Sequence, residues 1–355
     1  MVDNWEKKGL LTRNAHPWWA STPLKRPPGD DPWANAPAKG ATEAKIVQPY
    51  VSKVITKLAK APATRLRLVD AWNKVSYFNR KPDIVICPAE HASGESHPAA
   101  FYIVAVGDVK GRRLGSEEFN DDEIGRMISF LIDLLRTRPD RSEATGFLID
   151  GYIIQFIRVT IMRSAAGPGY KCDVTMPFLL PRATGTGAQP CGGDWLHSLL
   201  SQDPVVLGCP TTELSVDGTT VEITRYLGEG SSSVVWQGRH KERDVVVKVF
   251  RTGHEKDLTA EIRNLAAVKN LTGVTKFVGS HVSGGSGGGV LLLSPVGTPF
   301  SSHGHGGTIL PSAEHFAQLV GIVKAAHDEK INLLHRDLSL ANFFLGPDGK
   351  VRHHT

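Results

Sequence analysis

The chain has 355 residues, of which 41% are hydrophobic and 22% are charged, and its formal net charge is +5. This length allows about two domains of ordinary size, and the composition excludes a disordered or membrane-like protein. The modest positive charge permits nucleic acid or acidic partners without requiring them. No apolar run approaches the roughly 20 residues that a membrane-spanning helix needs, so we expect no membrane partner.

The first 40 residues mix tryptophans with many prolines and charges. We expect a poorly ordered leader over residues 1–40, and it contains no recognisable secretory signal. The four cysteines of the chain show no Cys-x-x-Cys spacing, which favours reduced thiols and no structural zinc. These features predict an intracellular protein, either cytoplasmic or nuclear.

Residues 41–200 alternate helical and strand patterns, which predicts a compact α/β domain. Asn120 and Glu123 form a capping box at the start of an amphipathic helix, and Asp150-Gly151 is typical of a hairpin turn. We expect residues 201–220 to be a linker. The predicted elements are a helix over 50–58, strands over 83–86 and 101–106, a helix over 120–135, and strands over 147–149 and 152–159.

Three residues of this domain have the chemistry of a metal site. Asp83 begins one predicted strand, and Asp108 ends the next, two residues before Lys110. Residues two apart on a strand share a face. Two carboxylates that hold a divalent metal, with a lysine beside the attacking water, suit phosphodiester hydrolysis. Glu43 is a candidate third carboxylate. Ordinary charges at the ends of surface strands are the alternative interpretation.

A glycine-rich turn opens the second half of the chain. Gly228, Gly230, Ser233 and Val235 fit the pattern Gly-x-Gly-x-x-Gly-x-Val, with serine in the third glycine position. Glycines allow backbone amides to approach phosphate oxygens, because no Cβ intervenes. These four residues are therefore candidate ATP-binding residues. An ordinary hairpin turn would carry a similar pattern.

Lys248 lies inside the apolar strand predicted over 245–250. Burying a lysine is costly unless an anion accompanies it, and Glu261 in the helix predicted over 258–268 can supply that anion. In protein kinases such a pair aligns the α- and β-phosphates of ATP. A lysine that reaches solvent from an edge strand is the alternative.

The residues His335 to Asn342 read His-Arg-Asp-Leu-Ser-Leu-Ala-Asn and fit the catalytic loop of protein kinases. In that loop Asp337 would accept the proton of a substrate hydroxyl, and Asn342 would hold Mg²⁺. Ser339 stands where many such kinases have lysine. Residues 346–351 predict the turn and strand that precede an Asp-Phe-Gly segment, and the sequence reaches Thr355 without that segment.

Two further segments complete this pattern. Residues 294–300 would form a hinge that offers backbone groups to adenine. The helix predicted over 313–330 has an apolar face, which would be exposed unless a partner or the first domain covers it.

Together with Val106 to Lys110, Arg138 to Arg141 and Gly146 to Phe156, these motifs resemble fungal-type protein kinases and kinase-bearing crinkler effectors. The resemblance implies an α+β protein, with a restriction-endonuclease-like α/β domain over residues 41–200. It also implies a protein kinase-like fold over residues 221–355, limited to the N-lobe and the start of the C-lobe. The implied activity is phosphoryl transfer from ATP, with Mg²⁺, to Ser or Thr hydroxyls of a protein substrate.

Three functions remain open at this point. The chain is an active Ser/Thr-type protein kinase, or a metal-dependent nuclease that uses Asp83, Asp108 and Lys110. The third alternative is a non-catalytic module, a pseudokinase by truncation, whose first domain binds nucleic acid or another protein.

Overall fold

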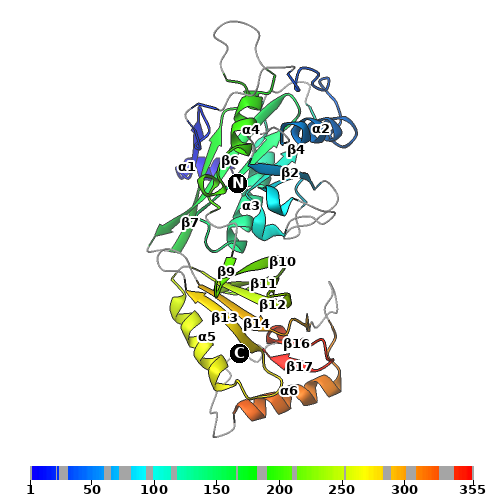
Figure 1. Cartoon of the computed structure of the whole chain (residues 1–355). Helices are drawn as coiled ribbons and strands as arrows, with labels where there is room; N and C mark the ends of the chain where they lie inside the picture. Colours follow the sequence, from blue (N-terminus) through cyan, green and yellow to red (C-terminus); the bar gives the residue numbers. More distant parts are fainter. Residues whose placement is uncertain are drawn as a thin grey trace. The chain divides into compact units, whose positions relative to one another are not determined.

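A computed structural model of the chain shows mixed α-helical and β-strand structure in two compact units, Met1–Thr212 (unit 1) and Glu213–Thr355 (unit 2) (Figure 1). All four cysteines lie in the described residues, where they are buried and form no disulfide bond. No helix of the described part is long and apolar enough to cross a membrane. The structure describes residues 2–20, 22–23, 31–59, 65–71, 81–92, 99–112, 118–164, 167–181, 190–209, 214–251, 253–282, 289–300, 309–327 and 340–353.

Unit 1 is built on an eight-stranded mixed sheet in the order β1-β7-β6-β5-β4-β3-β2, with β8 paired to β6. Strands β2, β3 and β4 are antiparallel neighbours, whereas β5 runs parallel to β4 after a crossover through helix α3 (Asp121–Thr137). The strands are β1 (Leu11–Asn14), β2 (Leu66–Asp70), β3 (Ile84–Pro88), β4 (Ala105–Val109), β5 (Glu143–Ile149), β6 (Ile153–Ser164), β7 (Gly167–Thr175) and β8 (Phe178–Leu179).

Helix α3 covers one face of this sheet, and its predicted capping box is confirmed. The Asn120 side chain accepts the Glu123 N–H at 2.9 Å, and the Glu123 carboxylate accepts the Asn120 N–H at 3.0 Å. The helix lies close to β5, because a Cβ added at Gly146 would be 2.7 Å from the sulfur of Met127. A glycine at this position therefore lets the helix approach the strand.

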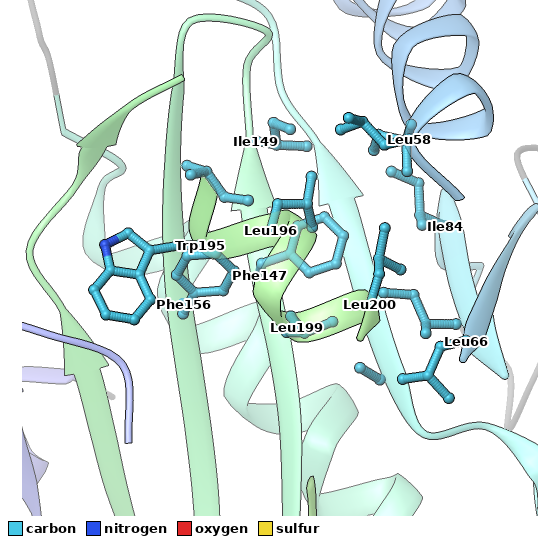
Figure 2. Close-up of a cluster of buried hydrophobic side chains, with 14 of the residues drawn as sticks. Leu58, Leu66, Ile84, Phe147, Ile149, Phe156, Trp195, Leu196, Leu199 and Leu200 are labelled. Carbon is cyan, nitrogen blue, oxygen red and sulfur yellow. The ribbon is translucent and has the colours of Figure 1, made fainter. Parts of the chain in front are cut away.

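Helices α2 (Gln48–Ala59) and α4 (Gly192–Leu200) contribute to the hydrophobic cluster on the other face. Figure 2 shows Leu196, Leu199 and Leu200 of α4 among Phe147 and Phe156 of the strands and other apolar side chains. Helix α2 corresponds to the helix predicted over 50–58. Helix α4 was not predicted, and all nine of its residues are buried.

The expected leader over residues 1–40 differs from the structure wherever the structure describes it. Helix α1 (Val2–Lys7) is followed by β1, which pairs in parallel with β7. Trp33 is fully buried, with its ring centroid 5.9 Å from that of Tyr50. Burial of such a large apolar side chain favours an ordered segment, so these residues are part of unit 1.

Short helical turns account for other departures from the predicted elements. The strand expected over 101–106 begins only at Ala105, because Ala100–Tyr102 forms the 3₁₀ helix η3. The remaining turns in unit 1 are the π-helix η1 (Glu43–Val47) and the 3₁₀ helices η2 (Ala89–His91) and η4 (Pro204–Leu207).

Unit 2 begins with a six-stranded sheet in the order β13-β14-β12-β11-β10-β9, and all its neighbouring strands are antiparallel. Its first strand, β9, falls within residues 201–220, so the expected linker is partly sheet. Helix α5 (Glu255–Ala267) packs Leu258 and Leu265 on one face. The strands are β9 (Leu214–Val216), β10 (Thr219–Glu229), β11 (Ser233–His240), β12 (Arg243–Phe250), β13 (Lys276–Val282) and β14 (Gly289–Ser294).

The sheet curves so that the side chains on its opposite face are buried. Trp236 and Val247 lie directly opposite each other on that face, and neither is exposed. A Cβ added at Gly279 of β13 would be 2.9 Å from a Val216 methyl group of β9, so the two edge strands approach each other. The sheet therefore curls around its own apolar face.

The rest of unit 2 is a three-stranded sheet covered by helix α6 (Ala313–Ala326). Ile322 of α6 belongs to the same buried cluster as Phe343 and Val351. The strands are β15 (Thr298–Pro299), β16 (Phe343–Leu345) and β17 (Val351–His353), and the 3₁₀ helix η5 (Leu340–Asn342) precedes β16.

Candidate functional sites

Strand pairing in unit 2 brings the glycine-rich turn and Lys248 into one row. Gly228 lies opposite Val235, Val235 lies opposite Lys248, and Lys248 lies opposite Leu291. Residues directly opposite each other in an antiparallel sheet share a face. The pairing of β10 with β11 shifts twice before this row, between Ile223 and Arg225 and between Tyr226 and Gly228.

Lys248 forms an ion pair with Glu261 of helix α5, with 2.5 Å between Nζ and Oε2. Both side chains are largely buried, at 21% and 12% exposure. Burial raises the pKa of Glu261, and the adjacent Lys248 cation opposes that shift. Glu261 thus holds the Lys248 ammonium group against the face of the sheet that α5 covers.

The glycine-rich turn leaves open space over its first two glycines. A Cβ at Gly228 would meet no atom within 4 Å, and one at Gly230 would meet only the Ser233 carbonyl oxygen at 4.0 Å. The Gly230 N–H donates to that same oxygen at 2.8 Å, which closes the turn. Ser233, in the third glycine position, is buried in β11 opposite Phe250, whereas Gly228 and Gly230 lie in the open part of the turn.

Of the catalytic loop predicted over residues 335–342, the structure describes only Leu340–Asn342. Asn342 is the last residue of η5, immediately before β16. Asp337 and Ser339 lie outside the described residues. Asp348 occupies the β16–β17 turn, within the turn and strand predicted over 346–351, where its carboxylate pairs with Arg352 and accepts the Lys350 N–H.

The predicted hinge follows β14. It runs through Pro295, Val296 and Gly297 into β15, which pairs with β16. A Cβ at Gly297 would collide with the Phe344 ring, so this chain segment lies directly against β16.

In unit 1 the register of β3 and β4 brings the two predicted carboxylates together. Ile84 pairs with Gly107, so the next residues outward, Asp83 and Asp108, lie opposite each other. Their carboxyl groups are hydrogen bonded, and Asp83 Oδ2 also accepts the Val109 N–H at 2.7 Å. Lys110 Nζ is 2.7 Å from Asp108 Oδ2, so all three predicted residues meet at the end of β4.

The surroundings of Asp83 favour its protonated form. Burial, followed by the hydrogen bond to Asp108 and the charge of Asp108, raises the pKa of Asp83 to about 8. The Val109 N–H and Lys110 act in the opposite direction without cancelling this shift. The pair therefore retains a proton near neutral pH, and a divalent cation could take the place of that proton.

Glu43 lies near this pair but does not complete a three-ligand cluster. A Cβ added at Gly111, the residue after Lys110, would be 3.4 Å from the Glu43 nitrogen. Within the described ranges, no three His, Cys, Asp or Glu side chains are grouped to hold a metal ion. The carboxylates of Asp83 and Asp108 are thus the donors that the structure brings together.

Two buried arginines support the segment that leads into β4. Arg138 donates to the Phe101 carbonyl at 2.6 Å and pairs with Asp140. Arg141 donates to the carbonyls of Ile103 and Val104, at 2.7 and 2.8 Å. The sequence Arg-Pro-Asp-Arg was part of the family resemblance, but its positioning role depends on contacts that are distant in the chain.

Comparison with known families gives a match in unit 1. A family model described as a domain of unknown function, DUF6826, matches residues 44–141. This span runs from η1 through α3 and includes Asp83, Asp108 and Lys110. No curated protein matches the chain.

Proposed function

We propose that unit 2 binds ATP with Mg²⁺ in the manner of a protein kinase N-lobe. The observation that carries this proposal is the 2.5 Å ion pair between Lys248 and Glu261, in the same cross-strand row as Gly228 and Val235. A buried lysine alone would not indicate a nucleotide site, because such a residue can also be purely structural. A lysine held by a helix carboxylate beside an open glycine turn fits a triphosphate.

The donor groups of this site match the parts of the nucleotide. The open turn at Gly228 and Gly230 would cradle the phosphates, and Lys248 would neutralise part of their charge. Glu261 would hold the lysine in position, while the segment 295–297 would lie beside adenine. When bound, Mg²⁺ and ATP would supply charge neutralisation and the transferable phosphoryl group.

Phosphoryl transfer to a protein Ser or Thr hydroxyl extends this proposal. Asp337 would accept the hydroxyl proton, and Asn342 would hold Mg²⁺. This step is supported by the fit of residues 335–342 to the catalytic-loop pattern and by the position of Asn342 directly before β16.

Calorimetric titration with Mg²⁺-ATP tests nucleotide binding directly. We expect Lys248→Ala to weaken binding by tenfold or more, because it removes the cation that faces the phosphates. Lys256→Ala, an equal loss of charge at an exposed position of α5, should bind like the wild type. Equal affinity of Lys248→Ala and the wild type would remove the basis of the proposal.

Transfer is tested separately with radiolabelled ATP and a generic protein substrate. Labelling that disappears in Asp337→Asn, while ATP binding remains, supports an active kinase. Binding without labelling in the wild type supports the pseudokinase alternative.

A second candidate function is metal-dependent phosphodiester hydrolysis by unit 1, with nucleic acid as the partner. It is favoured by the hydrogen-bonded pair of Asp83 and Asp108 with Lys110 at 2.7 Å. The two carboxylates would hold a divalent metal, and Lys110 would lie beside the attacking water. The match to DUF6826 includes these residues but assigns them no role.

Nicking of supercoiled plasmid in Mg²⁺ tests this candidate. Asp108→Ala should abolish nicking, because it removes one carboxylate and the partner of Lys110. Asp244→Ala, which changes an exposed aspartate of β12 in unit 2, is the matched control. Nicking that survives Asp108→Ala would exclude this site as its source.

A further inference from the structure

Helix α6 has two different sides. Its inner side packs Ile322 against Phe343 and Val351 of the three-stranded sheet, and Ala326 is also buried, whereas Phe316 and Val320 are 47% and 48% exposed. Its outward positions recur at alternating intervals of four and three residues, which is the spacing of a helix–helix seam. These exposed seam positions are Ala313, Ala317, Val320, Lys324 and His327.

We propose that this seam of α6 docks a second copy of the chain, with the two helices antiparallel about a twofold axis. The argument rests on the placement of charge. Glu314 lies in the first turn of the helix and Lys324 in the last turn. An antiparallel pair centred between Ala317 and Val320 brings Glu314 of each copy close to Lys324 of the other. The dimer would therefore contain two equivalent Glu314–Lys324 ion pairs, related by the twofold axis.

The middle of the seam allows close approach of the two helices. Ala317 is small, and a Cβ added at the neighbouring Gly321 would meet no atom within 4 Å. Val320 of each copy would face Ala317 of the other, and Phe316 would cover the edge of this contact. Gly321 also leaves room beside the seam for the Glu314–Lys324 pair.

The same surface disfavours a parallel pair, because parallel packing in register places Glu314 against Glu314 and Lys324 against Lys324. The helix has 14 residues and spans about 21 Å. This contact is smaller than the roughly 800 Å² per partner of ordinary stable interfaces, so we expect a weak, concentration-dependent dimer. The proposal depends on neither nucleotide binding nor nuclease activity.

Analytical ultracentrifugation of the full chain over a wide concentration range tests the proposal. Glu314→Lys alone and Lys324→Glu alone each oppose like charges twice, and each should weaken dimerisation by about tenfold or more. The double variant restores opposite charges and should recover affinity to within about threefold of the wild type. Lys256→Glu, an equal reversal on α5, should have no effect.

A second measurement locates the contact. A zero-length carbodiimide crosslinker should join Glu314 of one molecule to Lys324 of another, as identified by mass spectrometry on isotopically mixed samples. These residues are ten apart on one helix, about 15 Å along its axis, so a zero-length link within one molecule is excluded.

A chain that stays monomeric at every concentration, with α6 covered by unit 1 or by nothing, overturns the proposal. So does a dimer that neither charge reversal weakens, or one that the double variant fails to restore. Circular dichroism of each variant shows that the exposed substitutions leave the fold intact.

Discussion

Asp83 is a carboxyl group that the folded protein prefers to keep protonated. Its pKa of about 8 in the folded state lies above the ordinary value of 3.8, mainly because the group is buried and then because it bonds to Asp108. A raised folded-state pKa means that the folded chain binds this proton more tightly than the unfolded chain does. Asp83 therefore reduces stability progressively as pH rises from about 4 to about 8.

We predict that Asp83→Asn stabilises the protein increasingly across this pH range. Asparagine remains neutral and can still accept the Val109 N–H through its side-chain oxygen. We expect little gain at pH 4 and on the order of 2 kcal/mol at pH 8. Thermal unfolding at both pH values measures the difference. A gain that is the same at pH 4 and pH 8 would contradict a proton held by Asp83.

Residue pairs that follow from strand alternation could be predicted from the sequence. Asp108 and Lys110 are two apart where β4 ends, and alternation was expected to place them on one face. The partner of Lys248 was predicted on a different ground, because a lysine in an apolar strand needs an anion and the next helix could supply it. The proton retained by Asp83 could not be predicted. It depends on the pairing of Ile84 with Gly107, a register that is set by contacts distant in the chain.

At the scale of elements, β4 and β5 approach so closely that one of their positions excludes a side chain. A Cβ at Gly107 would collide with the ring of Phe147, which is fully buried among the side chains of α4 and the sheet. The ring cannot move aside without disturbing that cluster.

We therefore predict that Gly107→Ala destabilises unit 1 by about 1–3 kcal/mol. Urea unfolding followed by intrinsic fluorescence measures the loss. Gly321→Ala is the matched control, because its new methyl group would meet no atom within 4 Å, and alanine favours a helix. Equal stability of Gly107→Ala and the wild type would show that the ring relaxes freely.

Helices whose apolar residues recur with a clear helical period could be predicted from the sequence, and helices without that period could not. Helices α2 and α3 have one apolar face, and α3 also begins with a capping box. Helix α4 is buried on every side, so it lacks the polar face that marks a surface helix. The leader was misjudged because the burial of Trp33 depends on Tyr50, which is 17 positions away, rather than on local sequence.

At the scale of the whole molecule, the chain contains two units with separate hydrophobic clusters. A ligand stabilises the part of a protein to which it binds, by about 2.7 kcal/mol when its concentration is 100 times the dissociation constant. Nucleotide binding to unit 2 should therefore stabilise segments of unit 2 and leave those of unit 1 unchanged, which can be tested segment by segment.

We predict that Mg²⁺-ATP slows amide hydrogen exchange in β10, β11, β12 and α5 and leaves β3, β4 and β5 unchanged. Mass spectrometry of the full chain resolves these segments. Lys248→Ala should remove the protection, and Lys256→Ala should retain it. Protection confined to unit 1 would place the nucleotide elsewhere.

The structure divides the chain into two compact units between Thr212 and Glu213, within the region 201–220 where the sequence predicted a linker. The expected linker over 201–220 includes β9, which joins the second sheet because Val216 fills its curled interior. Its three residues are too few to show a strand period.

The two register shifts in β10 give that strand two extra residues, Thr224 and Leu227, which have no partner on β11. A bulge residue interrupts the alternation of side chains between the faces of a sheet, so its removal leaves the pairing on either side unchanged. Without Leu227, Tyr226 and Gly228 would follow each other opposite Trp236 and Val235, and the glycine turn would keep its face. These two positions are therefore the places where the strand can change length without moving the turn.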